Sequence, residues 1–257
     1  MPEHDDPTQL FLESLPEIKK DQTFEFACHP KVPCFNACCG DLNLMLTPYD
    51  VLRLRRGLNE SSKDFIQNRA EMGMAPDTGF PVLTLRMLEE EKKPCPFVSA
   101  SGCTLYADRP GACRTYPLGR ATRMDENGEV TERFFLVQEP HCRGFDEKTT
   151  WTPQTWLKDQ GLEVYNQFND RYMGLMARQK ETGRKIQTNQ ANMALLALYQ
   201  LDSFLNFIKD MKVFDRLNLP KDRQQAILEN EEARLEFALD WLELILFGKS
   251  ENIEIKA

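Results

Sequence analysis

The stretch CHPKVPCFNACCG, residues 28–40, decides the fold of the N-terminal part of this chain. It carries four cysteines in the pattern C-x5-C-x3-C-C. Pro30, Pro33 and Gly40 lie among them, and these residue types oppose a regular helix or strand. We therefore predict a loop here, and such a loop needs an external tie to hold one shape.

The cysteines of the whole chain share this part of the sequence. All eight lie within residues 28–142 of the 257, and residues 151–257 contain none. They form two groups of four, because the second group has the pattern C-x7-C-x9-C-x28-C. The eight predicted metal ligands are Cys28, Cys34, Cys38, Cys39, Cys95, Cys103, Cys113 and Cys142.

Three roles are open to these thiols: metal ligation, disulfide bonds, or burial as small apolar side chains. Disulfide frameworks are typical of small secreted proteins, which lack apolar residues for a core. This chain is 41% hydrophobic. It begins with the acidic and polar Met-Pro-Glu-His-Asp-Asp, unlike the basic and then apolar layout of a signal peptide. We therefore predict a cytoplasmic protein whose reduced thiols bind metal.

The number and spacing of the cysteines favour two sites. A four-coordinate metal or a cubane iron–sulfur cluster takes four thiolates, so two sites would use every thiol. Side chains of adjacent residues diverge, which makes Cys38 and Cys39 poor partners on one small ion. We expect the ligands to be interleaved between the two groups, with one large site as the alternative. His29 and His141 are secondary candidates, either as ligands or as hydrogen-bond donors to them.

The second group lies in a long and specific block: CPF at 95–97, GCTLY at 102–106 and RPGACRTYPLG at 109–119. Together with Cys38-Cys39, this block resembles the YkgJ-type cysteine-cluster family, which has a zinc- or iron-chelating CxxCxxCC domain. The resemblance covers roughly residues 28–142 and implies metal or iron–sulfur binding. The first group departs from the family name, which implies two-residue gaps. A related cysteine domain occurs in flagellin lysine methylases, but this sequence has no glycine-rich nucleotide-binding loop to support that activity.

Two arginines flank Cys113 and are candidate cofactor-binding residues, Arg109 and Arg114. A guanidinium near a negatively charged cluster lowers its energy and raises its reduction potential. The alternatives are contact with an anionic substrate, or ordinary solvated charges. No catalytic residue is identified: with three histidines, two of them next to cysteines, the sequence offers no Ser-His-Asp set.

Hydrophobic spacing predicts the remaining architecture. A helix is expected over 48–58, another short one after Ser61 or Ser62, and strands over 80–88 and 130–137 with a turn at 125–128. Helical stretches follow over 152–176, 189–214 and 220–247. The predicted fold is α+β: an irregular, loop-rich cysteine or metal-binding domain with few strands over residues 1–150, followed by a helical bundle over 151–257 packed on it.

Net charge and hydropathy exclude two classes of binding partner. The 32 basic and 40 acidic residues give a net charge of −8, which argues against nucleic acid bound through a basic surface. The apolar runs fall short of the roughly 18–20 residues that cross a bilayer, so we expect no membrane partner. The leading hypothesis is an iron–sulfur or iron-binding protein in redox or modification chemistry, for instance an iron–sulfur oxidoreductase. The alternative is a zinc-binding structural protein whose helices bind a partner. The partner is an unknown protein or small-molecule substrate.

Overall fold

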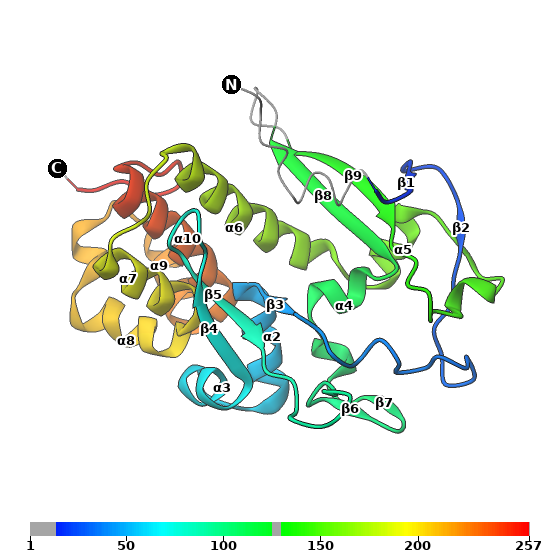
Figure 1. The fold of residues 1–257 in the computed structure, drawn as a ribbon. Coiled ribbons are helices and arrows are strands. Elements are labelled where there is room, and N and C mark those ends of the chain that lie inside the picture. Colours follow the sequence, from blue (N-terminus) through cyan, green and yellow to red (C-terminus); the bar gives the residue numbers. More distant parts are fainter. Residues whose placement is uncertain (1–13, 125–129, 257) are drawn as a thin grey trace. The chain divides into compact units, whose positions relative to one another are not determined.

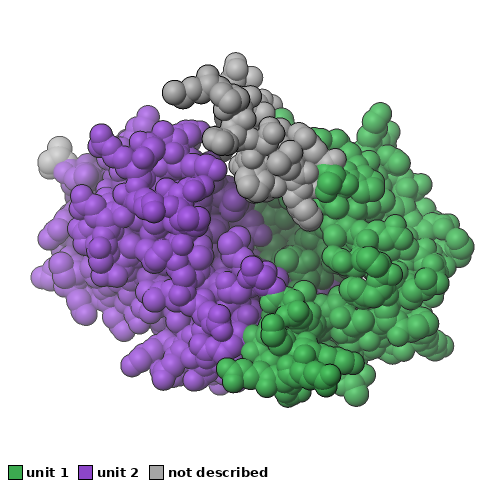
Figure 2. Space-filling model, viewed as in Figure 1, with its two compact units in different colours: residues 1–42, 87–106, 111–166 green, residues 43–86, 107–110, 167–257 purple. Residues whose placement is uncertain are grey.

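A computed structural model describes residues 14–124 and 130–256 of the chain. They form two compact units, coloured separately in Figure 2. Unit 1 comprises residues 1–42, 87–106 and 111–166, and unit 2 comprises residues 43–86, 107–110 and 167–257. Each unit is thus assembled from separate segments of sequence. The division at residue 150 stays a prediction about independently folding domains, and the predicted turn at 125–128 lies outside the described residues.

Unit 1 contains small antiparallel sheets (Figure 1). One has the strand order β1-β9-β8, from β1 (Glu17–Ile18), β8 (Leu118–Met124) and β9 (Val130–Leu136). Two further pairs are β2 (Phe24–Glu25) with β10 (Thr150–Trp151), and β6 (Val98–Ser99) with β7 (Gly102–Cys103). The predicted strand over 130–137 is confirmed as β9. Short helices complete the unit: η1 (Tyr106–Asp108) begins at its edge, and α4 (Gly111–Thr115), η2 (Gly144–Asp146) and α5 (Pro153–Asp159) follow.

The core of unit 1 is an aromatic cluster beneath the cysteine-bearing segments. Its buried members are Ile18, Phe24, Phe26, Leu118, Phe134 and Trp156. The Phe26 ring packs edge-on against Trp156, with 5.6 Å between ring centroids. Two indole N–H groups are satisfied by backbone carbonyls, Trp151 by Phe26 at 2.9 Å and Trp156 by Thr115 at 3.0 Å. The partly buried Cys142 and Tyr116 pack against this cluster, so the core positions part of the cysteine constellation.

Unit 2 begins with a helix and sheet that local sequence signals largely specify. The helix α2 (Pro48–Leu58) starts at a capping box, in which the Thr47 hydroxyl accepts from the Asp50 amide and Asp50 reaches back to the Thr47 amide. The predicted helix over 48–58 is therefore confirmed, as are α3 (Ser62–Arg69) after Ser61 and a strand within 80–88, β5 (Pro81–Leu85). The sheet order is β3-β5-β4, with β3 (Met45–Leu46) and β4 (Ala70–Met74).

The C-terminal region is mostly helical, as predicted, and the α+β class is confirmed. It contains α6 (Glu163–Glu181), α7 (Thr188–Tyr199), α8 (Leu201–Asp210), η3 (Val213–Arg216), α9 (Lys221–Glu229) and α10 (Glu231–Phe247). Each predicted helical stretch is divided into shorter helices. Gly161, at φ +63°, separates α5 from α6; Gln200 breaks the second stretch; and Asn230 caps α10 by accepting from the Ala233 amide. None of the described helices is long and apolar enough to cross a lipid bilayer.

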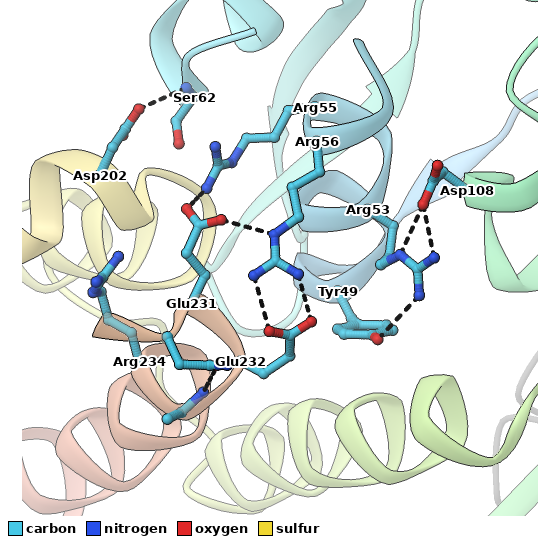
Figure 3. A network of polar contacts seen from close by, with 12 residues as sticks. Tyr49, Arg53, Arg55, Arg56, Ser62, Asp108, Asp202, Glu231, Glu232 and Arg234 are labelled. Atoms are coloured by element: carbon cyan, nitrogen blue, oxygen red, sulfur yellow. Dashed lines mark hydrogen bonds and ion pairs between the residues drawn. The ribbon is translucent and has the colours of Figure 1, made fainter. Parts of the chain in front are cut away.

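A polar network joins α2 to α10 within unit 2 (Figure 3). Arg56 binds Glu232 through both guanidinium arms, at 2.5 and 2.9 Å, and its Nε contacts Glu231 at 2.8 Å. The buried Arg55 pairs with Glu231 as well. Burial lowers the pKa of Arg55, while the nearby Asp202 charge opposes that shift. Because the cations face carboxylates, we interpret this network as a structural tie rather than a binding site.

A second buried charge cluster centres on Asp240 of α10, which is only 1% exposed. Its carboxylate accepts hydrogen bonds from Arg171 of α6, Arg223 of α9 and the Asn252 side chain. These contacts bring two helices and the C-terminal segment of unit 2 to one side chain.

We predict that Asp240→Ala lowers the free energy of unfolding by about 1–3 kcal/mol, because it leaves the Arg171 and Arg223 guanidinium groups, each about a third exposed, and the Asn252 side chain without their shared acceptor. Urea denaturation followed by circular dichroism measures this. The matched control is Asp77→Ala, which removes the exposed Asp77–Lys180 pair and is expected to cost less than about 1 kcal/mol. Equal effects of the two substitutions would contradict the role given to Asp240.

Candidate metal centre

The first cysteine-bearing segment is a chain of turns, as predicted. Backbone hydrogen bonds run from the Val32 amide to the His29 carbonyl, from Phe35 to Val32, from Ala37 to Cys34 and from Cys39 to Asn36. Asn36 adopts φ 68°, a left-handed conformation that asparagine tolerates. Its side-chain amide donates to the Ser99 carbonyl at 2.9 Å, which links the turns to the β6–β7 hairpin. The loop thus lacks helix or strand but has defined backbone ties.

Main-chain hydrogen bonds bring the distant cysteines to this loop. The Ala27 amide donates to the Gly144 carbonyl at 3.0 Å, which places the Cys142 segment beside Cys28. The Cys95 amide donates to the Cys39 carbonyl at 2.7 Å, and the Asp41 amide donates to Lys93 at 2.9 Å. Segments that are far apart in sequence therefore meet on one side of unit 1.

Four of the predicted ligands line one small cavity of about 30 Å³. Cys28, Cys34 and Cys38 come from the first group, and Cys142 comes from the second. The remaining lining residues are Phe26, Tyr116, His141 and Gly144. The Arg143 amide donates a hydrogen bond to the Cys34 sulfur, at 3.0 Å between the two atoms.

Tyr116 forms part of the wall of this cavity. Its ring packs edge-on against Phe26, with 5.9 Å between centroids. Burial raises the pKa of the Tyr116 hydroxyl far above its usual value, and the neighbouring Cys142 thiol adds to the shift. The buried hydroxyl oxygen has no hydrogen-bond partner among the described residues. Tyr116 therefore stays protonated and able to donate a hydrogen bond to a sulfur atom. Tyr116 lies in the block at residues 109–119, but nothing in the sequence indicated that it or Gly144 would face the cysteines.

The other four cysteines are linked to one another by electrostatic interaction. The Cys38 thiol raises the pKa of Cys39 through a hydrogen bond, burial adds to the effect, and the charges of Cys95 and Cys113 raise it further. Burial raises the pKa of Cys95, and the neighbouring Cys103 contributes. Cys103 lies in β7 and Cys113 lies in α4. These interactions associate Cys39 with the second group, whereas Cys38 faces the first cavity.

The Cys38–Cys39 contact connects the two sets of thiols. Its hydrogen bond lowers the pKa of Cys38 to about 6, against the opposing effect of burial. The two side chains are thus neighbours, yet their further contacts differ: Cys38 interacts with His141, and Cys39 with Cys95 and Cys113. The adjacent pair stands where the two sets meet.

The chemistry of the donor set fits a soft metal ion. All eight cysteines are free thiols, three of them exposed (Cys28, Cys38 and Cys113) and the others partly buried. Thiolate sulfur is the preferred donor for zinc and for iron–sulfur clusters. Within the described residues, no three histidine, cysteine, aspartate or glutamate side chains already stand at coordinating positions. Metal binding therefore requires the thiols around the cavity to draw together, a coupling of folding and binding that is usual for such sites.

The two histidines and the two arginines proposed as further site residues have different surroundings in the structure. His141 lines the cavity, whereas the His29 ring is engaged by the Lys31 amide at 3.3 Å and by Glu147 at 3.3 Å. Arg114 donates to the Gln160 carbonyl at 2.7 Å and lies over the Tyr165 ring, so its contacts fasten α4 to the segment after α5. Arg109 is 8% exposed and belongs to unit 2. The assignment of Arg109 and Arg114 to a cofactor stays a prediction.

Residues 27–150 match the family CxxCxxCC, described as "Putative zinc- or iron-chelating domain". This part of the chain, 124 of its 257 residues, is similar to that family. The match contains all eight cysteines, and it supports the predicted resemblance. The family description is at the level of zinc or iron chelation and leaves the type of centre open.

Two curated relatives are also similar to part of the chain. The U2 small nuclear ribonucleoprotein auxiliary factor 35 kDa subunit-related protein 2 of Mus musculus is 27% identical over 124 residues, 48% of this chain and 25% of that protein. Its Homo sapiens counterpart is 26% identical over 124 residues and is covered to 24%. The chain thus spans about a quarter of the length of these relatives, and the match carries no activity or partner to it. No solved structure matches.

We predict that Gly144→Ala destabilises the protein by about 1–3 kcal/mol, because the added methyl overpacks the cavity wall. A Cβ at this position would lie 2.5 Å from Cε2 of Phe26 and 2.8 Å from the Ala27 carbonyl oxygen. Urea denaturation of the metal-free protein measures the loss. The control is Gly73→Ala, where the nearest atom would be 3.6 Å away and no loss is expected. An unchanged Gly144→Ala variant would show that the Phe26–Gly144 contact is not maintained.

Proposed function

We propose that this chain is a metal-binding protein with two neighbouring thiolate centres in unit 1. The first centre uses Cys28, Cys34, Cys38 and Cys142. The second uses Cys39, Cys95, Cys103 and Cys113. The observation that carries the proposal is the single cavity lined by four cysteines, one of which comes from the second sequence group.

The interactions of the remaining four thiols support the second centre. The charges of Cys95 and Cys113 raise the pKa of Cys39, and the charge of Cys103 raises the pKa of Cys95. The hydrogen bond from the Cys95 amide to the Cys39 carbonyl fixes the two backbones side by side. Because four thiolates complete a tetrahedral ion or a cubane cluster, this partition leaves no cysteine over.

Iron, held as an iron–sulfur cluster or as an iron ion, is our first candidate. Structural zinc sites are closed, whereas the two centres proposed here include the exposed cysteines Cys28, Cys38 and Cys113. Exposure on this scale suits a centre that exchanges electrons or meets a substrate. When bound, an iron–sulfur cluster supplies one-electron redox chemistry. The chain holds the sulfur atoms. The Arg143 amide donates a hydrogen bond to the Cys34 sulfur, and the Tyr116 hydroxyl lies near Cys142.

Zinc is the second candidate, and the size of the cavity favours it. A volume of about 30 Å³ exceeds the roughly 10–15 Å³ that one water molecule needs in a cavity by only about two- to threefold. A single ion fits such a space after small movements of the thiols, whereas a cluster needs a larger expansion of the turns at residues 29–39. In this alternative the ions are structural, and the helices of unit 2 bind a partner.

Metal and acid-labile sulfide analysis of the full chain, purified without oxygen, distinguishes the two candidates. We expect brown protein with a broad absorption band near ~400 nm and stoichiometric sulfide, as is typical of iron–sulfur proteins. Colourless protein with two zinc ions per chain would favour the second candidate. Protein that retains neither metal after reconstitution with each would contradict the proposed function.

Paired cysteine variants test how the ligands are divided. We predict that Cys34→Ala and Cys103→Ala each remove about half of the bound metal, because each disables one four-thiolate centre. Cys34→Ala combined with Cys142→Ala should lose no more metal than either single variant. Cys34→Ala combined with Cys103→Ala should lose nearly all of it. Metal content per folded chain, with folding checked by circular dichroism, is the measurement.

The control for this series is His29→Ala. His29 is next to Cys28 in sequence, but its ring contacts the Glu147 carboxylate and accepts a hydrogen bond from the Lys31 amide. It should leave the metal content unchanged. The interleaved division is wrong if the metal losses of Cys34→Ala and Cys142→Ala add up in the double variant while those of Cys142→Ala and Cys103→Ala do not. The ligands then follow the two sequence groups.

A further inference from the structure

The sheet of unit 2 ends in a strand with an open edge. Among the residues that the structure describes, β4 pairs only with β5, in the register Glu71–Thr84 and Gly73–Val82. Hydrogen bonds from the Ala75 amide to Phe80 and from the Arg86 amide to Arg69 flank this ladder. In an antiparallel pair such bonds alternate, so the backbone groups of Glu71 and Gly73 face β5. Those of Met72 and Met74 therefore point away from the sheet.

β4 carries one exposed charge, Glu71, which pairs with Arg86 at 3.9 Å. The rest of its outer edge is apolar, unlike the charged edges that normally prevent strand addition. Met72 is 59% exposed and Met74 is 53% exposed. The edge is closed at its start, where the Arg86 guanidinium donates to the Ala70 carbonyl at 2.7 Å. The stretch open to another strand is thus Met72 to Met74.

A groove of about 450 Å³ runs alongside this edge, between the β4–β5 hairpin and the start of α7. Met72, Met74, Pro81, Ile186 and Leu195 line much of it. The groove is fixed in place because the Ile186 amide donates to the Thr78 carbonyl at 2.8 Å. Its volume lies in the range of about 300–1,000 Å³ that binding pockets commonly have.

The charge of the groove indicates what it binds. Lys185 is the one charged residue of the lining, which contains no aspartate or glutamate. Lys185 has no ion-pair partner among the described residues. The backbone of Gly79, at φ +75°, lies close beneath it, since a Cβ there would be 3.2 Å from Cβ of Lys185. The site therefore combines free strand hydrogen-bonding groups, apolar walls and one positive charge.

We propose that β4 and this groove bind an extended peptide segment of a partner protein, added as a further strand beside β4. Main-chain hydrogen bonds to Met72 and Met74 provide affinity, and alternate apolar side chains of the peptide enter the groove. A carboxylate of the peptide pairs with Lys185. The flexible thioethers of the methionines allow the walls to adapt to different side chains.

Selection from a phage-displayed library of random twelve-residue peptides tests the proposal on the full chain. The library is depleted on the Met74→Lys variant and then selected on the wild type. We expect enriched peptides with alternating apolar residues and an acidic residue. Their affinity, measured by fluorescence anisotropy, should fall at least tenfold with Lys185→Glu and with Met72→Lys. The matched control is Met211→Lys, because Met211 is 50% exposed but does not line the groove; it should leave the affinity unchanged.

Hydrogen exchange of the same complexes reports the binding mode. Strand addition should slow exchange of the Met72 and Met74 amides at least tenfold. The proposal is overturned if no peptide distinguishes the wild type from Met74→Lys, or if peptides bind without protecting these amides. It is also overturned if dodecanoate occupies the groove and displaces the peptides while the two amides stay unprotected, since the groove is then a site for small apolar acids. None of these outcomes bears on the cysteine centres of unit 1.

Discussion

Main-chain hydrogen bonds between distant segments are the constraint on which the cysteine constellation depends. The turns at residues 29–39 contain no helix or strand, yet the bond from Ala27 to Gly144 and the bond from Cys95 to Cys39 fix their two ends. The aromatic cluster around Phe26 supports the first of these ends. Because the ties involve the backbone, they position the thiols without using any sulfur atom. All eight sulfurs remain available to a metal.

Local sequence signals correctly predicted the helices and strands that contain caps or β-forming residues. They failed where pairing between distant segments determines the secondary structure. The Thr47 cap and Pro48 specified the start of α2, and the β-forming residues before Leu85 indicated β5. β4 was missed, because a segment containing Glu71 and Gly73 has little strand preference and is extended by pairing with β5. The breaks at Gly161, Gln200 and Asn230 were also missed, since the apolar spacing continues across them.

The cysteine site shows the same limit. Spacing and adjacency led to the expectation that the ligands are interleaved, because Cys38 and Cys39 are poor partners on one ion. The sequence contained nothing to say that Cys142 joins Cys28, Cys34 and Cys38. That grouping depends on the hydrogen bond between the Ala27 amide and the Gly144 carbonyl, which only the folded chain reveals. The difference between His29 and His141 likewise follows from their neighbours in space.

The two units therefore have separate chemistry: thiols in unit 1, and an apolar strand edge with a groove in unit 2. The central claim concerns the first. Anomalous diffraction at the metal absorption edge, from crystals of the metal-loaded full chain, tests it most directly. The account predicts two anomalous peaks, one bonded to Cys34 and Cys142 and the other to Cys39 and Cys103. A single peak, or disulfide bonds among these cysteines, would contradict it.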